Sequence, residues 1–212
     1  MKTEGKMSNA KYIVVDGLDG SGKGEVIKAL EEIFPSDLLI RTREPGGTLL
    51  AEKIRAILLT EKMDPFTEMC LFLGARREVR NMVERFLSQG RHVLSDRSDS
   101  STFAFQICGR ERGYLEESFW RLNDLLSPHP TLYLFLDLPA EVAQGRLKKR
   151  ESSGGEMSKF DAEEIAFHNR VREGFRKFSE KSKVKCLFVD AARSREVVAK
   201  EVIDHIKEHL NS

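Results

Sequence analysis

The chain has 212 residues, which is enough for one well-packed domain and too few for two of ordinary size. Lys and Arg together number 35 and Asp and Glu 34, so the formal net charge is only +1. This balance argues against nucleic acid as a partner and against a polybasic membrane binder. The sequence contains no apolar run of the roughly 18 residues that a membrane-spanning helix needs.

The N-terminus and the cysteines both favour a cytoplasmic location. The start of the chain is polar and lacks the apolar core of a signal peptide, so we expect residues 1–10 to form a flexible arm. Cys70, Cys108 and Cys186 lie far apart and without the spacing of metal ligands. We therefore expect three reduced thiols in a cytoplasmic protein.

Five short apolar or β-branched runs predict five β-strands, each of which leads into a helical pattern. Some of these runs, such as the one that begins with Ile13, are apolar on both faces. Strands that are buried in a parallel sheet typically show this pattern. The runs lie at residues 12–15, 38–41, 92–95, 132–136 and 186–189.

Helical periodicity occurs between these strands. The apolar stripe of residues 26–33 includes Ile33 and is ended by Pro35, and longer stripes cover residues 69–87 and 197–206. The alternation of strand and helix predicts an α/β fold with three layers, in which a five-stranded parallel sheet is flanked by helices.

The segment DGLDGSGKG at residues 16–24 follows the first predicted strand and opens a predicted helix. It matches the phosphate-loop pattern G-x-x-x-x-G-K, and Lys23 supplies the cation that reaches the β- and γ-phosphates. Glycines let backbone N–H groups turn onto phosphate oxygens, and the helix N-terminus adds positive potential. We predict that ATP binds to Gly17, Leu18, Asp19, Gly20, Ser21, Gly22, Lys23 and Gly24.

Gly24 departs from the usual pattern, which places Ser or Thr there as a ligand of Mg²⁺. Mg²⁺ readily keeps several waters, so a water could take the place of the missing hydroxyl. Asp96 ends a buried strand, and we expect it to hold Mg²⁺ through water. Adenylate kinases resemble this chain in carrying Gly after the loop lysine. Gly24 therefore favours a nucleoside monophosphate kinase over a GTPase or a motor ATPase.

Three further segments resemble the thymidylate kinase family, particularly its bacterial form. They are TREPGGTLLAEKIRAILL at 42–59, LFLGARR at 71–77 and DRSDSSTFAFQ at 96–106. Their order and spacing behind the phosphate loop also match those of the family. The resemblance extends from Lys11 to the C-terminal helix, so it covers nearly the whole chain.

The resemblance implies a P-loop NTPase fold in a single domain, residues 11–212, with a small lid at about 146–161. It implies the ATP-dependent phosphorylation of dTMP to dTDP, with ATP as co-substrate and Mg²⁺ as cofactor. It also implies a homodimer, with helical residues 66–87 contributing to the interface.

The base of the substrate needs contacts to its face and to its O4 edge. Phe72 and Arg76 are four residues apart and so project from one face of a helix. By resemblance, Phe72 stacks on thymine and Arg76 donates to O4, where the amino group of cytosine would oppose it. Thr102 and Gln106 match a polar pair that completes the base edge. Phe105 stands where the family usually has Tyr, so the wall against a ribose 2′-hydroxyl lacks the phenol.

The phosphate of the substrate needs fixed positive charge. Arg97 and Arg55 match the arginines that clamp it, and Arg97 lies where the acceptor meets the transferred group. Asp19 resembles the carboxylate that accepts from the sugar 3′-hydroxyl. Glu44 resembles an acid near the acceptor and the metal, although its position next to a Pro-Gly-Gly turn is also compatible with a surface acid.

A cation is needed opposite the transferred phosphoryl group. Bacterial relatives carry it in the lid, and the matching residue is Lys159. Arg146, Lys149 and Arg150, on the preceding helix, could serve instead. The resemblance also implies that Arg146 and Arg193 contact the adenine of ATP.

Three alternatives stay open. Gly74 and Ser98 are small and could leave room for another base, as in a kinase for dUMP or a 5-substituted dUMP. Gly24 and Lys159 together are compatible with a nucleotide-binding homologue that has weak catalysis. The third alternative is a purely structural α/β protein.

Overall fold

The computed structural model describes residues 9–152 and 163–212. Within them the predicted α/β fold is confirmed: five strands form one parallel sheet in the order β2-β3-β1-β4-β5. The strands are β1 (Tyr12–Gly17), β2 (Leu39–Arg43), β3 (His92–Asp96), β4 (Leu132–Asp137) and β5 (Lys185–Asp190). Each predicted strand is present, and its bounds differ from the prediction by no more than two residues.

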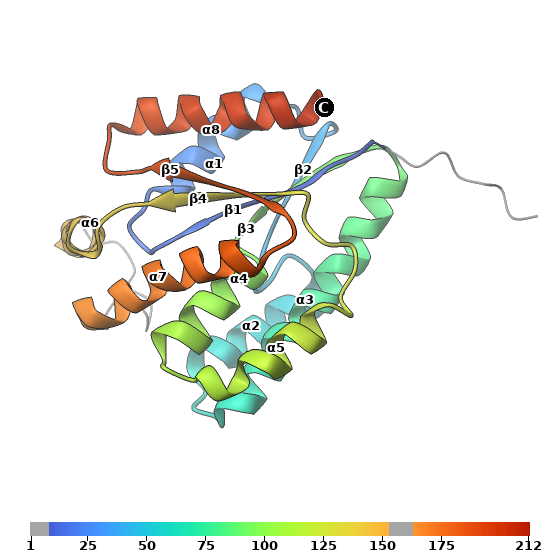
Figure 1. The fold of residues 1–212 in the computed structure, drawn as a ribbon. Coiled ribbons are helices and arrows are strands. Elements are labelled where there is room, and N and C mark those ends of the chain that lie inside the picture. The colour runs from blue at the N-terminus through green and yellow to red at the C-terminus, as the bar shows by residue number, and fades with distance from the viewer. Residues whose placement is uncertain (1–8, 153–162) are drawn as a thin grey trace, which may run out of the picture.

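Helices cover both faces of the sheet, so the three predicted layers are present. Figure 1 shows α1 and α8 on one face, with α3, α5 and α7 on the other. The α-helices are α1 (Lys23–Ile33), α2 (Leu49–Thr60), α3 (Pro65–Ser88), α4 (Asp99–Ser101), α5 (Glu116–Asn123), α6 (Ala140–Ser152), α7 (Ile165–Lys181) and α8 (Arg195–Leu210). A π-helix, η1 (Thr102–Gly109), follows α4, and a 3₁₀ turn, η2 (Gly113–Leu115), precedes α5.

The central strands are buried on both faces, as their sequences predict. Every residue of β1 is buried, and so are the first five residues of β4. Val14 pairs with Ser95 of β3 on one side and with Tyr133 of β4 on the other. The apolar stripe of α1 is partly wrong, because Ile33 is 45 % exposed and Phe34 takes its place in the core.

The long helix α3 begins at a well-formed cap. The Asp64 carboxylate accepts hydrogen bonds from the backbone N–H groups of Phe66 at 2.8 Å and Thr67 at 3.3 Å. Pro65 occupies the first turn, where its missing N–H costs nothing. These residues fix the start of the helix that carries Phe72 and Arg76.

The π-helix η1 packs closely on α7. A Cβ atom added at Gly174 of α7 would lie 2.8 Å from Ala104 Cα and 2.9 Å from Cys108 Cβ. Only glycine permits this approach, which holds η1, with Thr102, Phe105 and Gln106, against α7. Segments of π-helix often mark functional sites, and no feature of the sequence predicted one here.

Some predictions fall outside the described residues. They are most of the N-terminal arm, the part of the lid from residue 153 onward, and Lys159. The three cysteines are free, as expected, with Cys70 exposed and the other two half-buried. Within the described ranges, none of the helices is both long and apolar enough to cross a membrane.

Candidate active site

The phosphate loop lies between β1 and α1, as the motif requires. Gly20 and Gly22 have φ angles of 81° and 92°, which favour glycine. Lys23 is 8 % exposed and lies across the loop, where its Nζ donates to the carbonyl oxygens of Gly17 at 3.1 Å and Leu18 at 2.9 Å. Burial and the nearby Arg97 lower the pKa of Lys23.

A wide groove, which we name the loop groove, runs over the phosphate loop between α6 and α8. Arg146, Arg193 and Asp96 line it, and so do the alternative lid cations Lys149 and Arg150. Gly17 and Leu18 are not part of its wall, and their carbonyl oxygens accept hydrogen bonds from Lys23. The groove is lined by Asp19, Gly20, Ser21, Gly22, Lys23, Gly24, Glu25, Val26, Asp96, Arg97, Arg146, Leu147, Lys149, Arg150, Ala191, Arg193, Arg195 and Val198.

A second cavity, which we name the Arg76 pocket, lies between α2, α3 and η1. Every residue predicted to bind the substrate lines it. Gly74, which the sequence suggested could leave room near the base, is exposed on α3 and is not part of the wall. The pocket is lined by Asp19, Glu44, Pro45, Arg55, Leu58, Leu59, Phe72, Arg76, Arg97, Ser98, Ser101, Thr102, Phe105 and Gln106.

Asp19 and Arg97 line both cavities, so they mark the place where the two meet. Arg97 Nη2 donates to Asp19 Oδ1 at 2.6 Å, and Nη1 donates to Ser101 Oγ at 2.8 Å. The guanidinium also lies over the ring of Phe105, 5.0 Å from its centroid. Although burial opposes ionisation of both groups, their mutual attraction raises the pKa of Arg97 and lowers that of Asp19.

Asp16, which was not predicted as a site residue, holds Arg97 in place. This aspartate is fully buried at the end of β1, and its Oδ1 accepts from Arg97 Nη1 at 3.2 Å and from Ser101 Oγ at 2.8 Å. Ser100 Oγ donates to Oδ2 at 2.6 Å. Burial raises the pKa of Asp16 despite the nearby Arg97 and Lys23. An acid at the end of an otherwise apolar strand was the available signal.

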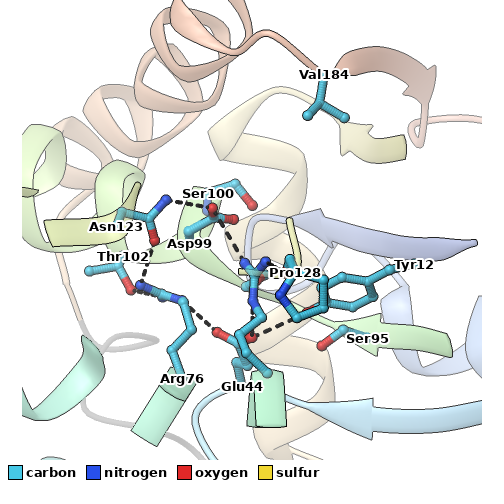
Figure 2. Close-up of polar contacts among 12 residues, drawn as sticks. Tyr12, Glu44, Arg76, Ser95, Asp99, Ser100, Thr102, Asn123, Pro128 and Val184 are labelled. Carbon is cyan, nitrogen blue, oxygen red and sulfur yellow. Dashed lines mark hydrogen bonds and ion pairs between the residues drawn. The ribbon is translucent and has the colours of Figure 1, made fainter. Parts of the chain in front are cut away.

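Arg76 is held from three sides, as Figure 2 shows. Its Nε donates to Glu44 Oε2 at 2.8 Å, its Nη2 to Thr102 Oγ1 at 2.7 Å and its Nη1 to Asn123 Oδ1 at 3.4 Å. The side chain is 1 % exposed. An arginine has five N–H donors, so this arrangement leaves donors available to a ligand in the pocket.

Glu44 is not a surface acid, because it is only 4 % exposed. Besides Arg76, its carboxylate accepts from Ser98 Oγ at 3.1 Å and from Tyr12 Oη at 3.3 Å, both through Oε1. Arg55 of α2 holds the loop that contains Glu44, because its guanidinium donates to the carbonyl oxygen of Pro45 at 3.0 Å. Burial and the neighbouring Arg43 lower the pKa of Arg55.

Asp96 provides a candidate contact for a cation in the loop groove. Its Oδ1 is buried and, within the described residues, accepts no hydrogen bond. A Cβ atom added at Gly24 would find no described atom within 4 Å, so the position offers space for a water. Asp96 and Gly24 both line the loop groove, and a carboxylate oxygen without a hydrogen-bond donor in the described residues suits a hard cation such as Mg²⁺. No cluster of three or more metal-ligating side chains occurs in residues 9–152 and 163–212.

A phosphate loop beneath one cavity, with an arginine shared with a second cavity, is typical of a P-loop kinase. Comparison with known proteins narrows this class. A family model described as thymidylate kinase matches residues 15–202. The chain belongs to the thymidylate kinase family, and it is a nucleoside monophosphate kinase.

Thymidylate kinases from several bacteria are similar to this chain over almost their whole length. The thymidylate kinase of Lactobacillus acidophilus is 35 % identical over 94 % of this chain and 94 % of its own. That of Oenococcus oeni is 36 % identical, covering 96 % of this chain and 98 % of its own. The crystal structure of thymidylate kinase from Ehrlichia chaffeensis superposes with a TM-score of 0.72 at 28 % identity, covering 93 % of this chain and 98 % of that one.

Proposed function

We propose that the Arg76 pocket binds dTMP and the loop groove binds ATP, so that the γ-phosphoryl group passes directly from ATP to dTMP to give ADP and dTDP. The phosphorylation of dTMP to dTDP is the reaction of the thymidylate kinase family. The observation that carries the assignment of sites is the shared wall: Asp19 and Arg97 line both cavities. Direct transfer requires only that donor and acceptor be held in line, and no covalent enzyme intermediate is needed.

We propose that Lys23 and Arg97 neutralise the negative charge on the transferred phosphoryl group. Lys23 exchanges its hydrogen bonds with the Gly17 and Leu18 carbonyls for bonds to phosphate oxygens. Arg97 is fixed by Asp19, so its guanidinium needs little reorganisation during the reaction. Asp96 would hold Mg²⁺ through water, and the bound ion would neutralise part of the phosphate charge.

The cation of the lid that would contact the transferred phosphoryl group has several candidates. Lys159 stays a prediction, because it lies outside the described residues. Arg146, Lys149 and Arg150 of α6 line the groove, and an arginine offers the bidentate fork that suits a phosphoryl group. Arg146 of α6 and Arg193 of the loop between β5 and α8 both line the groove, and we assign the contacts with the adenine ring to them.

Recognition of the substrate is assigned to the walls of the Arg76 pocket. Phe72 supplies a face for thymine, and Arg76, Thr102 and Gln106 supply the polar edge. Asp19 accepts from the sugar 3′-hydroxyl, Arg55 and Arg97 bind the 5′-phosphate, Glu44 holds Arg76 and Phe105 closes the sugar side.

We also propose that the enzyme is a cytoplasmic homodimer. Large apolar side chains are exposed on α2 and α3, where Leu49 is 91 %, Ile57 44 % and Phe66 48 % exposed. Exposed apolar side chains on adjacent helices suit an interface between copies. Sedimentation equilibrium would give twice the chain mass, and a monomer at micromolar concentration would contradict the dimer.

The test of the proposed function is coupled ADP release across a panel of acceptors, with and without Mg²⁺. We expect dTMP to give the highest kcat/KM, above dUMP, 5-hydroxymethyl-dUMP, dCMP and dGMP, and we expect turnover to require Mg²⁺. Higher kcat/KM with dUMP or its 5-substituted form would establish the alternative substrate. Binding of ATP and dTMP by calorimetry without any ADP release would indicate a nucleotide-binding homologue.

A further inference from the structure

Arg80 of α3 is a fully buried arginine that lies outside both cavities. It is 0 % exposed and is not part of the wall of the Arg76 pocket. It follows Arg76 by four residues, so the two side chains project from one face of α3. A buried guanidinium is costly unless its environment compensates it, which raises the question of what holds this one in place.

Four polar groups and one ring surround Arg80. Nη2 donates to Ser98 Oγ at 3.2 Å and lies 3.5 Å from Asp99 Oδ2. Nε lies 3.8 Å from Glu44 Oε1, too far for a hydrogen bond but close enough for attraction between charges. Nη1 donates to the carbonyl oxygen of Pro128, and the guanidinium lies over the ring of Tyr12, 5.0 Å from its centroid.

Asn123 completes a connection back to Arg76. Its Nδ2 donates to Asp99 Oδ2 at 2.8 Å, and its Oδ1 accepts from Arg76 Nη1 at 3.4 Å. A carboxylate only accepts and a guanidinium only donates, so these two partners fix which way the amide points. Figure 2 shows Asn123 between Asp99 and Arg76.

These contacts form a closed ring, Arg76–Glu44–Arg80–Asp99–Asn123, which returns to Arg76. We name it the buried ring. It contains two guanidinium groups and two carboxylates, so its charges balance. Arg76 and Glu44 face the Arg76 pocket, whereas the other three members lie behind them.

The far side of the buried ring is rigidly held. Tyr133 Oη donates to Asp99 Oδ1 at 2.7 Å, and the backbone N–H of Ser100 donates to the same oxygen at 3.1 Å. Burial alone would raise the pKa of Asp99, but Arg80 and Arg76 together with the hydrogen bonds from Tyr133 and Asn123 lower it. These contacts hold Asp99 in place as an anchor for Arg80.

We propose that Arg80 is a positioning residue for recognition of the base: it holds Glu44 and, through Asp99 and Asn123, directs the Arg76 donors into the pocket. The inference rests on the proposed function, in which Arg76 contacts the base. Without Arg80, two carboxylates would compete for one guanidinium, and Arg76 would turn away from the position in which it meets O4. A residue that served only to fill the core would affect stability and leave recognition unchanged.

The test compares three variants. Arg80→Met removes the charge and keeps the length, whereas Arg80→Lys keeps the charge but loses the fork that faces two carboxylates. Arg77→Met is the matched control, because Arg77 is exposed on the same helix and likewise donates to the neighbouring loop, at the Ser127 carbonyl. The wild-type protein is assayed first: if it does not phosphorylate dTMP, the proposed function fails, and not the role of Arg80.

The readouts are the KM for dTMP and the ratio of kcat/KM for dTMP to that for dCMP, neither of which depends on the fraction of enzyme that is folded. Arg80→Met should raise the KM about tenfold or more and lower the ratio about as much, which is the effect of a misplaced hydrogen bond to a charged donor. Arg80→Lys should fall between Arg80→Met and wild type, and Arg77→Met should match wild type.

Unchanged KM and selectivity in Arg80→Met, with only a lower melting temperature, would overturn the proposal. If Arg80→Met does not fold, Arg80→Lys decides alone: a KM for dTMP within a factor of about two of the wild-type value would overturn the proposal, and a larger increase would support it.

Discussion

At the residue scale, Arg97 occupies an unusual backbone conformation where the two cavities meet. Its φ angle is 65°, in the left-handed region that non-glycine residues rarely adopt. Such a residue carries strain of about 1–3 kcal/mol, and its surroundings must hold it in place. Hydrogen bonds to Asp16, Asp19 and Ser101 do so here. The strained backbone therefore belongs to the residue whose side chain we expect to contact the transferred phosphoryl group.

Gly24 leads to a prediction about metal affinity. A Cβ atom at this position would meet no described atom within 4 Å, so Gly24→Thr should fit at the start of α1. A hydroxyl there would replace one water ligand, and we expect a lower Mg²⁺ concentration for half-maximal activity. Titration of Mg²⁺ at fixed ATP measures this, with Gly24→Ala as the control that adds a side chain without an oxygen.

An unchanged Mg²⁺ requirement in Gly24→Thr would mean that water already fills the position well. An equal shift in Gly24→Ala would attribute the effect to the helix and not to the metal.

The predicted residues that the structure brings together share one property: they lie in short motifs. Every predicted substrate-binding residue lines the Arg76 pocket, because each belongs to a segment whose order and spacing match the family. Asp16, Arg80 and Asn123 were missed, because their partners are distant in sequence. The Ser100–Asp16 contact spans 84 positions and the Arg76–Asn123 contact 47. Spacing alone gives no sign of such contacts.

At the element scale, the contact between η1 and α7 positions Phe105 and Gln106. We predict that Gly174→Ala destabilises the fold by about 1–3 kcal/mol, because the new Cβ would overlap the backbone of η1 at Ala104. The control is Gly74→Ala on α3, where the Cβ is exposed and meets no described atom within 4 Å. It should stabilise the fold by about 0.5–1 kcal/mol, because alanine favours a helix. Urea unfolding measures both changes, and equal effects would contradict the packing argument.

Asp137 joins the end of β4 to α7 through a two-pronged contact. Arg172 Nε donates to Oδ1 at 2.6 Å and Nη2 to Oδ2 at 2.8 Å. Burial would raise the pKa of Asp137, but Arg172 and Arg176 lower it below the ordinary value of 3.8. A depressed pKa stabilises the fold above pH 3.8, and this stability is lost as the pH falls through the lower, folded value.

We therefore expect Asp137→Asn to lower the free energy of unfolding by about 1–3 kcal/mol at pH 7. This loss should shrink as the pH falls below the ordinary pKa of 3.8. Urea unfolding at several pH values measures it. The control is Asp204→Asn, which alters an exposed Lys200–Asp204 pair. It should leave the free energy of unfolding unchanged at each of these pH values. A loss that stays constant with pH would show that the carboxylate charge is not responsible.

The elements themselves were only partly predictable. The central strands β1 and β4 were predictable because they are apolar on both faces and almost entirely buried. The ends of the five strands were misplaced by one or two residues because polar residues at strand ends carry no periodic signal. The π-helix η1 was not expected, since it packs closely on α7 through its own Gly109 and through Gly174 of α7, a contact that its own periodicity does not reveal.

At the scale of the whole molecule, both cavities lie at the carboxyl ends of the parallel strands. Asp16 and Gly17 end β1, Asp96 ends β3, and Ala191 follows β5. Open parallel sheets place ligand sites at this edge. Although the overall charge is balanced, the loop groove has an excess of positive charge, because seven Lys and Arg side chains and only three acidic side chains line it. This local excess suits a polyphosphate, although the whole chain is nearly neutral.

We propose that Lys23 and Arg97 stabilise the phosphoryl group as it passes between the two cavities. The direct measurement is the rate of dTDP formation from ATP and dTMP in Lys23→Ala and Arg97→Ala, with circular dichroism to verify the fold. Each variant should lose about 10²–10³ in kcat, as removal of a preorganised donor does. Turnover close to wild type in either folded variant would contradict the account.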